Sequence, residues 1–227
     1  MKTLIPLFIL LILTGCVPTK KISYDISTVE SLQDSISINK TFSVFNFDDI
    51  REEVSDTEIL FDSGNLYGSG SERICINAEK HYEEGKVSRQ VSEMIYFHIR
   101  RTAVFDSMAM NSDKLNYALK GSIKRLYGEQ KFSKRASAGA QFGLIGALAT
   151  ANIKSPGKMR ITLTNLHLVD NETGNEIPLE DIDLQFEGEY RIDAKCWFIY
   201  DHVNERLKET IDLRLLPAII EKTSSQH

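Results

Sequence analysis

The chain has 227 residues, of which 42% are hydrophobic and 26% charged, with 13 Gly and 5 Pro. This composition excludes collagen-like, low-complexity and wholly disordered proteins. The length allows one good-sized hydrophobic core or two small ones. The 27 basic and 32 acidic side chains leave a formal net charge of −5, which argues against a dedicated nucleic-acid binder.

The N-terminal segment 1–15 predicts a signal peptide. Lys2 precedes an uninterrupted apolar run from Leu4 to Leu13. A run of about ten residues is too short to cross a hydrocarbon core of ~30 Å as a helix, but it fits the hydrophobic region of a signal peptide. The run ends in Leu-Thr-Gly-Cys at Cys16, which resembles the lipobox of bacterial lipoproteins.

This resemblance implies that the mature protein begins at Cys16 and carries lipid there. The family pattern is a thioether-linked diacylglycerol plus an N-linked acyl chain such as palmitate, and more than one chain makes anchoring stable. In the family, Asp after the lipidated Cys retains a protein in the inner membrane. Val17 therefore implies the periplasmic face of the outer membrane. Residues 16–40 are polar and are predicted to form a tether.

The other two cysteines are Cys75 and Cys196. In an envelope compartment a disulfide between them can persist, and closing a loop of about 120 residues would add several kcal/mol of stability in the chain-entropy model. The alternative is that both are small buried hydrophobic residues. The sequence leaves both interpretations open.

The first half of the chain predicts two strands and one helix. Residues 42–47 are rich in β-formers, and an acidic loop region follows from 48 to 62. A short strand is predicted at 72–77 and a helix at 85–102. The helix carries one apolar stripe with spacings of three and four, formed by Val87, Val91, Met94, Ile95 and Ile99.

The second half predicts further strands and a C-terminal helix. Val104 and Phe105 form a short edge segment, and alternation predicts strands at 115–127, 159–169 and 184–192. A turn at 170–174 makes the last two strands an antiparallel pair. The helix, at 199–216, has apolar residues that step by four: Ile199, Val203, Leu207, Ile211 and Leu215.

These elements predict an α+β fold: a mixed, mainly antiparallel sheet with two helices packed on one face. A single periplasmic domain is expected at 41–217. Pro217 is expected to end or kink the last helix, because proline lacks the N–H that continues it. Residues 218–227 would then form a C-terminal tail.

Residues 136–153 interrupt this pattern, because they contain no charged side chain over 18 positions and have basic neighbours on both sides. Three interpretations are open. The segment inserts into a membrane, although Ala, Gly, Gln and Asn make it weakly hydrophobic. It contacts a partner or a second copy through its small residues. It is a loop between two strands. Its candidate contact residues are Phe142, Leu144, Ile145 and Leu148.

No motif predicts a catalytic residue, a metal site or a cofactor. Gly-x-Ser-x-Gly, Cys-x-x-Cys and His-Glu-x-x-His are absent from the sequence, as are the nucleotide and EF-hand motifs. Residues 170–189 hold eight carboxylates and no basic residue. They form either a cation-binding surface or a solvated strand face, and strand alternation favours the second. The histidines have no motif spacing: His81, His98, His167, His202 and His227.

Beyond the signal segment, the order of features resembles periplasmic lipoproteins with a TolB-N-terminal-like α/β domain, including the curli-secretion lipoprotein. The resemblance covers about residues 40–216, and its members serve assembly, secretion or transport. It is carried by these segments: 42–47, 91–99, 104–106, 115–123, the insert and 168–174.

Together these patterns lead us to expect a non-enzymatic, membrane-anchored accessory or scaffold protein of an envelope assembly, secretion or transport system. Its expected partners are the membrane, through the lipid anchor, and envelope proteins or other copies of itself, but not nucleic acid. The alternative is a self-assembling, membrane-inserting component of a secretion channel. A periplasmic hydrolase ranks last.

Overall fold

The structure, a computed structural model, describes residues 38–51, 73–76, 86–132, 153–191 and 198–225. Its strands and helices in chain order are β1 (Ile38–Val44), β2 (Asp48–Asp49), β3 (Arg73–Ile76), α2 (Lys86–Arg101), β4 (Phe105–Met110), β5 (Tyr117–Phe132), β6 (Lys154–Asp170), β7 (Asn175–Pro178), β8 (Ile182–Arg191), α5 (Phe198–Thr210), the π-helical turn η4 (Ile211–Leu215) and α6 (Leu216–Ser224).

All the described strands belong to one eight-stranded sheet, with β4, β1, β5, β6 and β7 as successive neighbours. β1 pairs in parallel with β4 and β5, while β5 pairs antiparallel with β6 over most of its length. β7 and β8 both pair antiparallel with β6 and together form one edge of the sheet. The predicted antiparallel pairing of the strands around the 170–174 turn is therefore confirmed.

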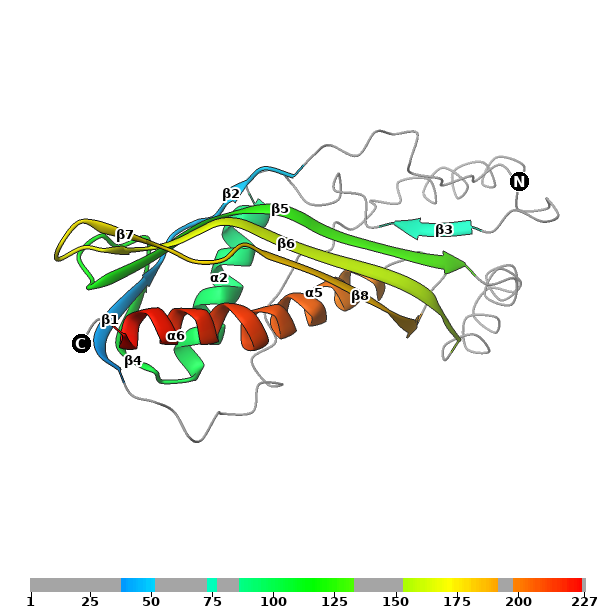
Figure 1. The fold of residues 1–227 in the computed structure, drawn as a ribbon. Helices are drawn as coiled ribbons and strands as arrows, with labels where there is room; N and C mark the ends of the chain where they lie inside the picture. The colour runs from blue at the N-terminus through cyan, green and yellow to red at the C-terminus, as the bar shows by residue number, and fades with distance from the viewer. Residues whose placement is uncertain (1–37, 52–72, 77–85, 133–152, 192–197, 226–227) are drawn as a thin grey trace, which may run out of the picture.

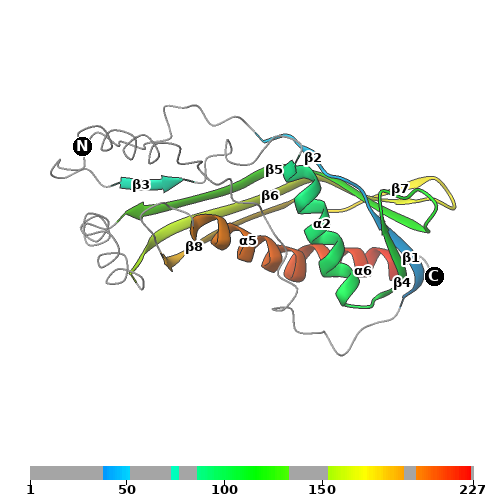
Figure 2. The ribbon, with the colours of Figure 1, turned by 180° about the vertical axis from the view of Figure 1, so that it is seen from behind.

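Helices cover one face of this sheet (Figure 1). α2 precedes β4, the parallel neighbour of β1, and α5 packs on the β5–β6 pair and runs on into η4 and α6. From behind, both helical segments lie on the same side of the strands (Figure 2). The predicted fold class, α+β with a mixed, mainly antiparallel sheet and helices on one face, is confirmed.

The hydrophobic core lies between the sheet and these helices. All five residues of the predicted α2 stripe are at most 1% exposed. The four-residue stripe of the C-terminal helix is also confirmed from Val203 to Leu215, and Ile219 extends it. Below them, the two long central strands contribute buried apolar side chains to the same core: Leu119, Ile123, Leu126, Ile161 and Leu163. Both amphipathic patterns therefore identify the helix faces that pack on the sheet.

The first strand begins earlier than predicted. Ile38 lies within the segment expected to be a tether, yet its side chain is 5% exposed. Its backbone N–H donates to the carbonyl of Val104 at 2.7 Å. Because this apolar residue has both core contacts and a backbone partner, the globular fold includes residues 38–40.

The two central strands are longer than their alternation predicted. β5 has 16 residues and β6 has 17, and they remain paired out to Gln130 and Gly157. Ile153, the last residue of the predicted insert, packs against the core. Apart from that residue, the insert lies outside the described residues.

Pro217 does not end the C-terminal helix, which continues to Ser224. A proline at 217 cannot donate the α-helical hydrogen bond to the carbonyl of Leu213, and its ring crowds that carbonyl. The preceding turn widens instead: the N–H of Leu216 donates to Ile211 in π-helical fashion. Residues 218–224 are thus part of the fold rather than the expected tail.

The centre of the sheet holds a local irregularity at Gly121. The β5–β6 register shifts between Lys120 and Ser122, and Asn165 opposite has a left-handed φ of 53°. A Cβ atom at Gly121 would lie 2.6 Å from Leu166 Cδ2 and 2.8 Å from the ring of Phe47. Glycine is therefore required here by close packing.

Candidate functional site

A groove lies between the β7–β8 edge of the sheet and the C-terminal helix. Residues 179–184 form one wall, and residues 213–221 form most of the other. Its volume is about 430 Å³, within the range of natural ligand sites. The floor is apolar and includes Leu166. We refer to this concavity as the edge groove.

The strand wall exists because β7 and β8 do not join into one continuous strand. Between Pro178 and Ile182 three residues leave the ladder, opposite the irregular backbone at Asn165. Leu179 keeps one backbone hydrogen bond, to the carbonyl of Leu166 at 2.9 Å, and its side chain is buried. The next two side chains, Glu180 and Asp181, are exposed. The interruption thus places two adjacent carboxylates beside an apolar floor.

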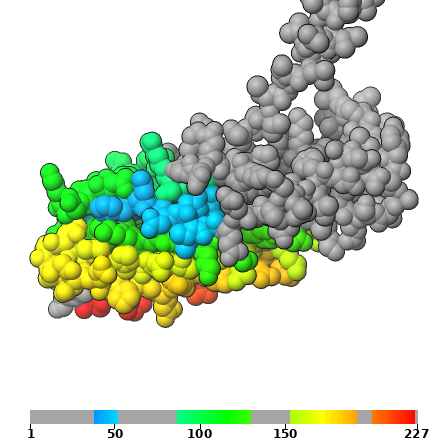
Figure 3. Space-filling model, turned by 90° about the horizontal axis from the view of Figure 1, so that it is seen from above, coloured from blue at the N-terminus to red at the C-terminus, as the bar shows by residue number. Residues whose placement is uncertain are grey.

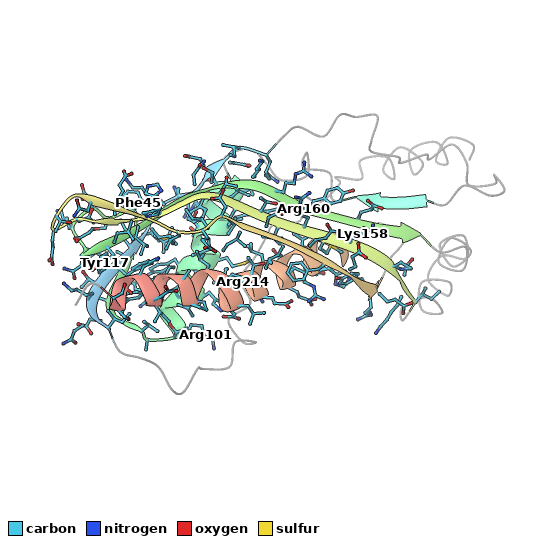
Figure 4. The ribbon with its side chains drawn as sticks, in the orientation of Figure 1. Phe45, Arg101, Tyr117, Lys158, Arg160 and Arg214 are labelled. Carbon is cyan, nitrogen blue, oxygen red and sulfur yellow. The ribbon has the colours of Figure 1, made fainter. Side chains whose placement is uncertain are left out.

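The helical wall is formed around the π-turn. Leu213 is 62% exposed, the largest exposure among the described large hydrophobic side chains, and lines the groove together with Pro217 and Ala218. Arg214 follows Leu213 and lies on the helical layer, whereas Arg160 lies on the sheet (Figure 4). Widening of the helix ahead of the proline therefore accompanies an apolar side chain that faces solvent.

The rim of the edge groove is acidic. Glu180, Asp181 and Glu221 form no ion pair with any described residue, nor does Arg214. Asp183, also at the groove, accepts hydrogen bonds from Arg160 Nε and Thr162 Oγ1, both at 2.8 Å. The hydrogen bond from Arg160 lowers the pKa of Asp183 to about 2, so the charge of this carboxylate is already compensated.

A buried histidine supports the π-turn from the other side. His98 of α2 is 1% exposed and its Nε2 is hydrogen-bonded to Asp212 of η4. This contact joins two helices 114 residues apart in sequence. The buried ring of His98 thereby holds the turn that forms the groove wall.

A second polar cluster attaches α5 to β8. Arg206 lies over the rings of Phe186 and Tyr190, at 5.0 and 5.6 Å from the guanidinium carbon to the ring centroids. Burial lowers the pKa of Arg206, but the hydrogen bond with Glu209 and the nearby hydroxyl of Tyr190 outweigh it and raise the pKa above its ordinary value. His202 Nε2 donates to the carbonyl of Arg191, 3.0 Å away. These contacts hold the helix beside the edge strand.

The remaining acids between 170 and 189 are spread over the fold instead of converging. Asp170 accepts hydrogen bonds within the 170–174 turn; burial raises its pKa, but these bonds outweigh burial and lower it. Glu172 pairs with Lys40 at 3.8 Å, and Glu187 with Lys158 at 3.4 Å. Burial, followed by the nearby charges of Asp170 and Glu172, raises the pKa of Tyr117. The solvated-surface interpretation holds for these residues.

The sheet face opposite the helices is polar. Alternation along β6 puts Lys158 and Arg160 on this face, where they pair across to β8. Lys120 lies 5.1 Å from the ring centroid of Phe45. Viewed from above, the strands themselves form the exposed surface over the coloured part of the molecule (Figure 3). Cross-strand pairs of opposite charge stabilise such an exposed face.

Most of the residues singled out from the sequence lie outside the described residues. These include Cys16, Cys196, His81 and His227, together with the candidate contacts at Phe142, Leu144, Ile145 and Leu148. Cys75 lies in β3, opposite Gln130 in the register. The proposed bond from Cys75 to Cys196 therefore stays a prediction.

Sequence reasoning missed the edge groove. Two signals were available: Leu213 lies off the four-residue apolar stripe, and Pro217 lies within an apolar helical pattern. Neither signal says that residues 179–181 leave the sheet beside this turn. The groove depends on that juxtaposition.

Within the described ranges, no three His, Cys, Asp or Glu residues lie close enough together to hold a metal ion. In the same ranges, no helix is both long enough and apolar enough to cross a membrane. The helix α2 shows why: its buried stripe is balanced by charged residues such as Arg89 and Glu93, which pair at 2.7 Å on its surface.

No protein-family model matches the sequence, and no curated protein matches it significantly. The α+β fold has similarities among solved structures. One is the crystal structure of a Xanthomonas campestris protein of family DUF330, with a TM-score of 0.47, 8% identity, and coverage of 88% of this chain and 95% of that chain.

A second similar structure is a Helicobacter pylori protein described as a homolog of the neuraminyllactose-binding hemagglutinin. It has a TM-score of 0.37, 6% identity, and coverage of 92% of this chain and 94% of that chain. Neither similarity carries an argument about function. The resemblance to TolB-N-terminal-like domains stays a prediction.

Proposed function

We propose that this chain is a bacterial lipoprotein, anchored through Cys16 to the periplasmic face of the outer membrane, that acts without catalysis as an accessory or scaffold protein of an envelope assembly, secretion or transport system. The observation that carries the proposal is the Leu-Thr-Gly-Cys sequence directly after a short apolar run. That pattern combines a secretion signal with a thiol for lipid attachment.

The distance from anchor to domain fits this role. Ile38, the first residue that the structure describes, follows Cys16 by 22 residues. A chain of that length cannot extend beyond roughly 80 Å, at about 3.3–3.6 Å per residue. An anchored domain of this kind reaches partners in or near the membrane surface and is confined to that layer.

The edge groove supports protein binding. It presents an exposed Leu213 beside carboxylates that have no partner among the described residues. Uncompensated charge next to exposed apolar surface is typical of a surface that meets another molecule. In this proposal the groove belongs to the scaffold function, and the lipid anchor determines where it acts.

Metabolic labelling with a fatty-acid probe tests the anchor. The intact chain is expected to take up label and to fractionate with outer membranes, whereas a Cys16→Ala variant takes up none. A Cys75→Ala variant is the matched control and should label normally. An unlabelled intact chain, processed and released into the soluble periplasm, would contradict the anchor.

Site-specific photo-cross-linking in intact cells tests the scaffold role. A photoreactive residue at exposed Leu213 should give discrete adducts with the same envelope proteins in repeated experiments. The same residue at Gln185, on the polar edge strand, is the comparison. Absence of any adduct above background at both positions would count against an accessory role.

A further inference from the structure

The acidic rim of the edge groove defines the charge of what it can hold. The negative charge comes from Glu180 and Asp181 on the strand wall and from Glu221 on the helical wall, and Arg214 is the one basic residue among those that line the groove. Asp183 is not counted, because Arg160 already neutralises it. The groove therefore has an excess of two negative charges. Such a rim repels anionic lipid headgroups and nucleic-acid phosphates, and it attracts a cationic ligand.

The apolar part of the groove adds a second requirement. Leu213 is 62% exposed, and Pro217 and Ala218 lie beside it over a floor that includes Leu166. A simple cation would leave this apolar surface exposed to water. A ligand with hydrocarbon between its charges would bury it, at about 25 cal/mol for each Å² removed from water.

The dimensions of the groove fit a short segment of polypeptide as its ligand. Its strand wall covers residues 179–184, about 20 Å of extended backbone. Its helical wall covers residues 213–221, about 13 Å of helix. A groove of these dimensions accommodates a few consecutive residues of a peptide.

The walls are held in position before any ligand arrives. Asp212 at the π-turn is fixed by the buried ring of His98, and Leu179 and Ile182 of the strand wall are both 8% exposed. A preformed groove loses little conformational entropy on binding.

We propose that the edge groove binds a basic segment of a partner protein in which Lys or Arg side chains alternate with apolar ones. The basic side chains would lie between Glu180, Asp181 and Glu221, and an apolar side chain would pack on Leu213. This inference rests on the proposed scaffold function and names the chemistry of its partner.

The test uses the full lipidated chain, purified in non-ionic detergent micelles, and a fluorescein-labelled peptide of lysines and leucines in the order Lys-Leu-Lys-Lys-Leu-Lys. Fluorescence anisotropy measures binding, with empty micelles as the blank. Two comparison peptides replace every Lys by Glu, or every Leu by Ser. Both are expected to bind more weakly than the Lys-Leu peptide, and binding should weaken as salt screens the rim charges.

Three variants locate the site. The double variant Glu180→Gln/Asp181→Asn is expected to weaken peptide binding about fivefold, or about 1 kcal/mol at a tenfold change per 1.4 kcal/mol. Leu213→Ala should weaken it by a similar factor, roughly fivefold. Glu176→Gln is the matched control, because Glu176 is an exposed carboxylate on β7 outside the groove. Circular dichroism confirms that each variant is folded.

The inference is overturned if the peptide does not bind, or if it binds equally to all variants. It is also overturned if the protein forms a concentration-dependent dimer that Leu213→Ala abolishes while the peptide has no effect, because a second copy then occupies the groove. Cross-links to envelope proteins without any effect of the rim charges would remove this inference and leave the scaffold function. Failed lipid labelling with intact peptide binding would do the reverse.

Discussion

Replacing Gly121 by Ala places a methyl group against two buried side chains at the centre of the sheet. The added Cβ would lie 2.6 Å from Leu166 Cδ2 and 2.8 Å from Phe47 Cε2. Leu166 is 2% exposed and Phe47 is fully buried, so the added methyl group displaces packed side chains and not water.

The expected cost follows from overpacking. Forcing one extra carbon into a packed core destabilises by about 1–3 kcal/mol, and alanine recovers only ~0.5–1 kcal/mol from its lower flexibility in the unfolded chain. We therefore expect Gly121→Ala to lower the free energy of unfolding by about 1 kcal/mol. For a chain of this size that corresponds to a fall in Tm of about 2–4 °C.

Urea unfolding followed by circular dichroism measures this difference, and Gly188→Ala provides a matched control. Gly188 also lies in a strand, but a Cβ there would meet only the ring of Tyr190 at 3.6 Å, so its replacement should be neutral or slightly stabilising. The double variant Gly121→Ala/Leu166→Ala should lose less than the sum of its single changes, since one clash is removed. Equal effects at Gly121 and Gly188 would refute the packing argument.

Ala103, directly after α2, has a left-handed φ of 52°, a conformation that strains alanine but not glycine. Ala103→Gly should therefore raise the free energy of unfolding, measured in urea, by about 0.5–1 kcal/mol. A loss of stability would show that the backbone at this residue is not strained. Asp212→Ala should cost about 1–3 kcal/mol because it removes a hydrogen-bond partner of His98, and Asp212→Asn, which keeps an oxygen acceptor, should cost less; equal costs would contradict that role. The folded-state pKa of Asp183 is depressed to about 2. The stabilisation of the fold by its ion pair with Arg160 is therefore complete above about pH 4 and is lost as the pH falls through about 2. The stability advantage over Arg160→Gln should shrink over that range, and a difference independent of pH would argue against the pair.

The helices were predictable because their buried residues recur at short, regular spacings along the sequence. The α2 stripe and the C-terminal steps of four each place apolar side chains on one face, and those faces pack on the sheet. A step of four advances an α-helix by about 400°, so four steps from Val203 to Ile219 would drift by ~160° on a regular helix. The π-turn at 211–215 takes up part of this drift, which explains why a stripe spaced by four stays buried.

The strand order was less predictable, because it depends on contacts between distant segments. Local alternation identifies β5, β6 and β8, and the 170–174 turn joins neighbours. It does not reveal that β1 inserts between β4 and β5, since parallel partners are not joined by a short turn. Nor does it reveal β7, whose four residues are too few to show a period.

The two proposed sites, the lipidation site and the edge groove, differ in the same way. Lipidation at Cys16 is a motif of adjacent residues, and the sequence suffices to predict it. The edge groove brings together residues 179–184 and residues 213–221, which share no motif. Only the interruption of the edge strand and the widening of the helix before Pro217 make them neighbours.

The central position of β1 has a consequence for how the fold forms and how it responds to force. Thr41 hydrogen-bonds to Asn116, and Asn46 to Asn111, across 75 and 65 residues of chain. Closing such loops is entropically costly and slows folding. Although β1 is synthesised first, it can pair only once β4 and β5 are present. β1 is also the first strand that the structure describes, so tension from the proposed anchor at Cys16 would reach the described residues at Ile38. The strand with the most distant partners would then bear that load first.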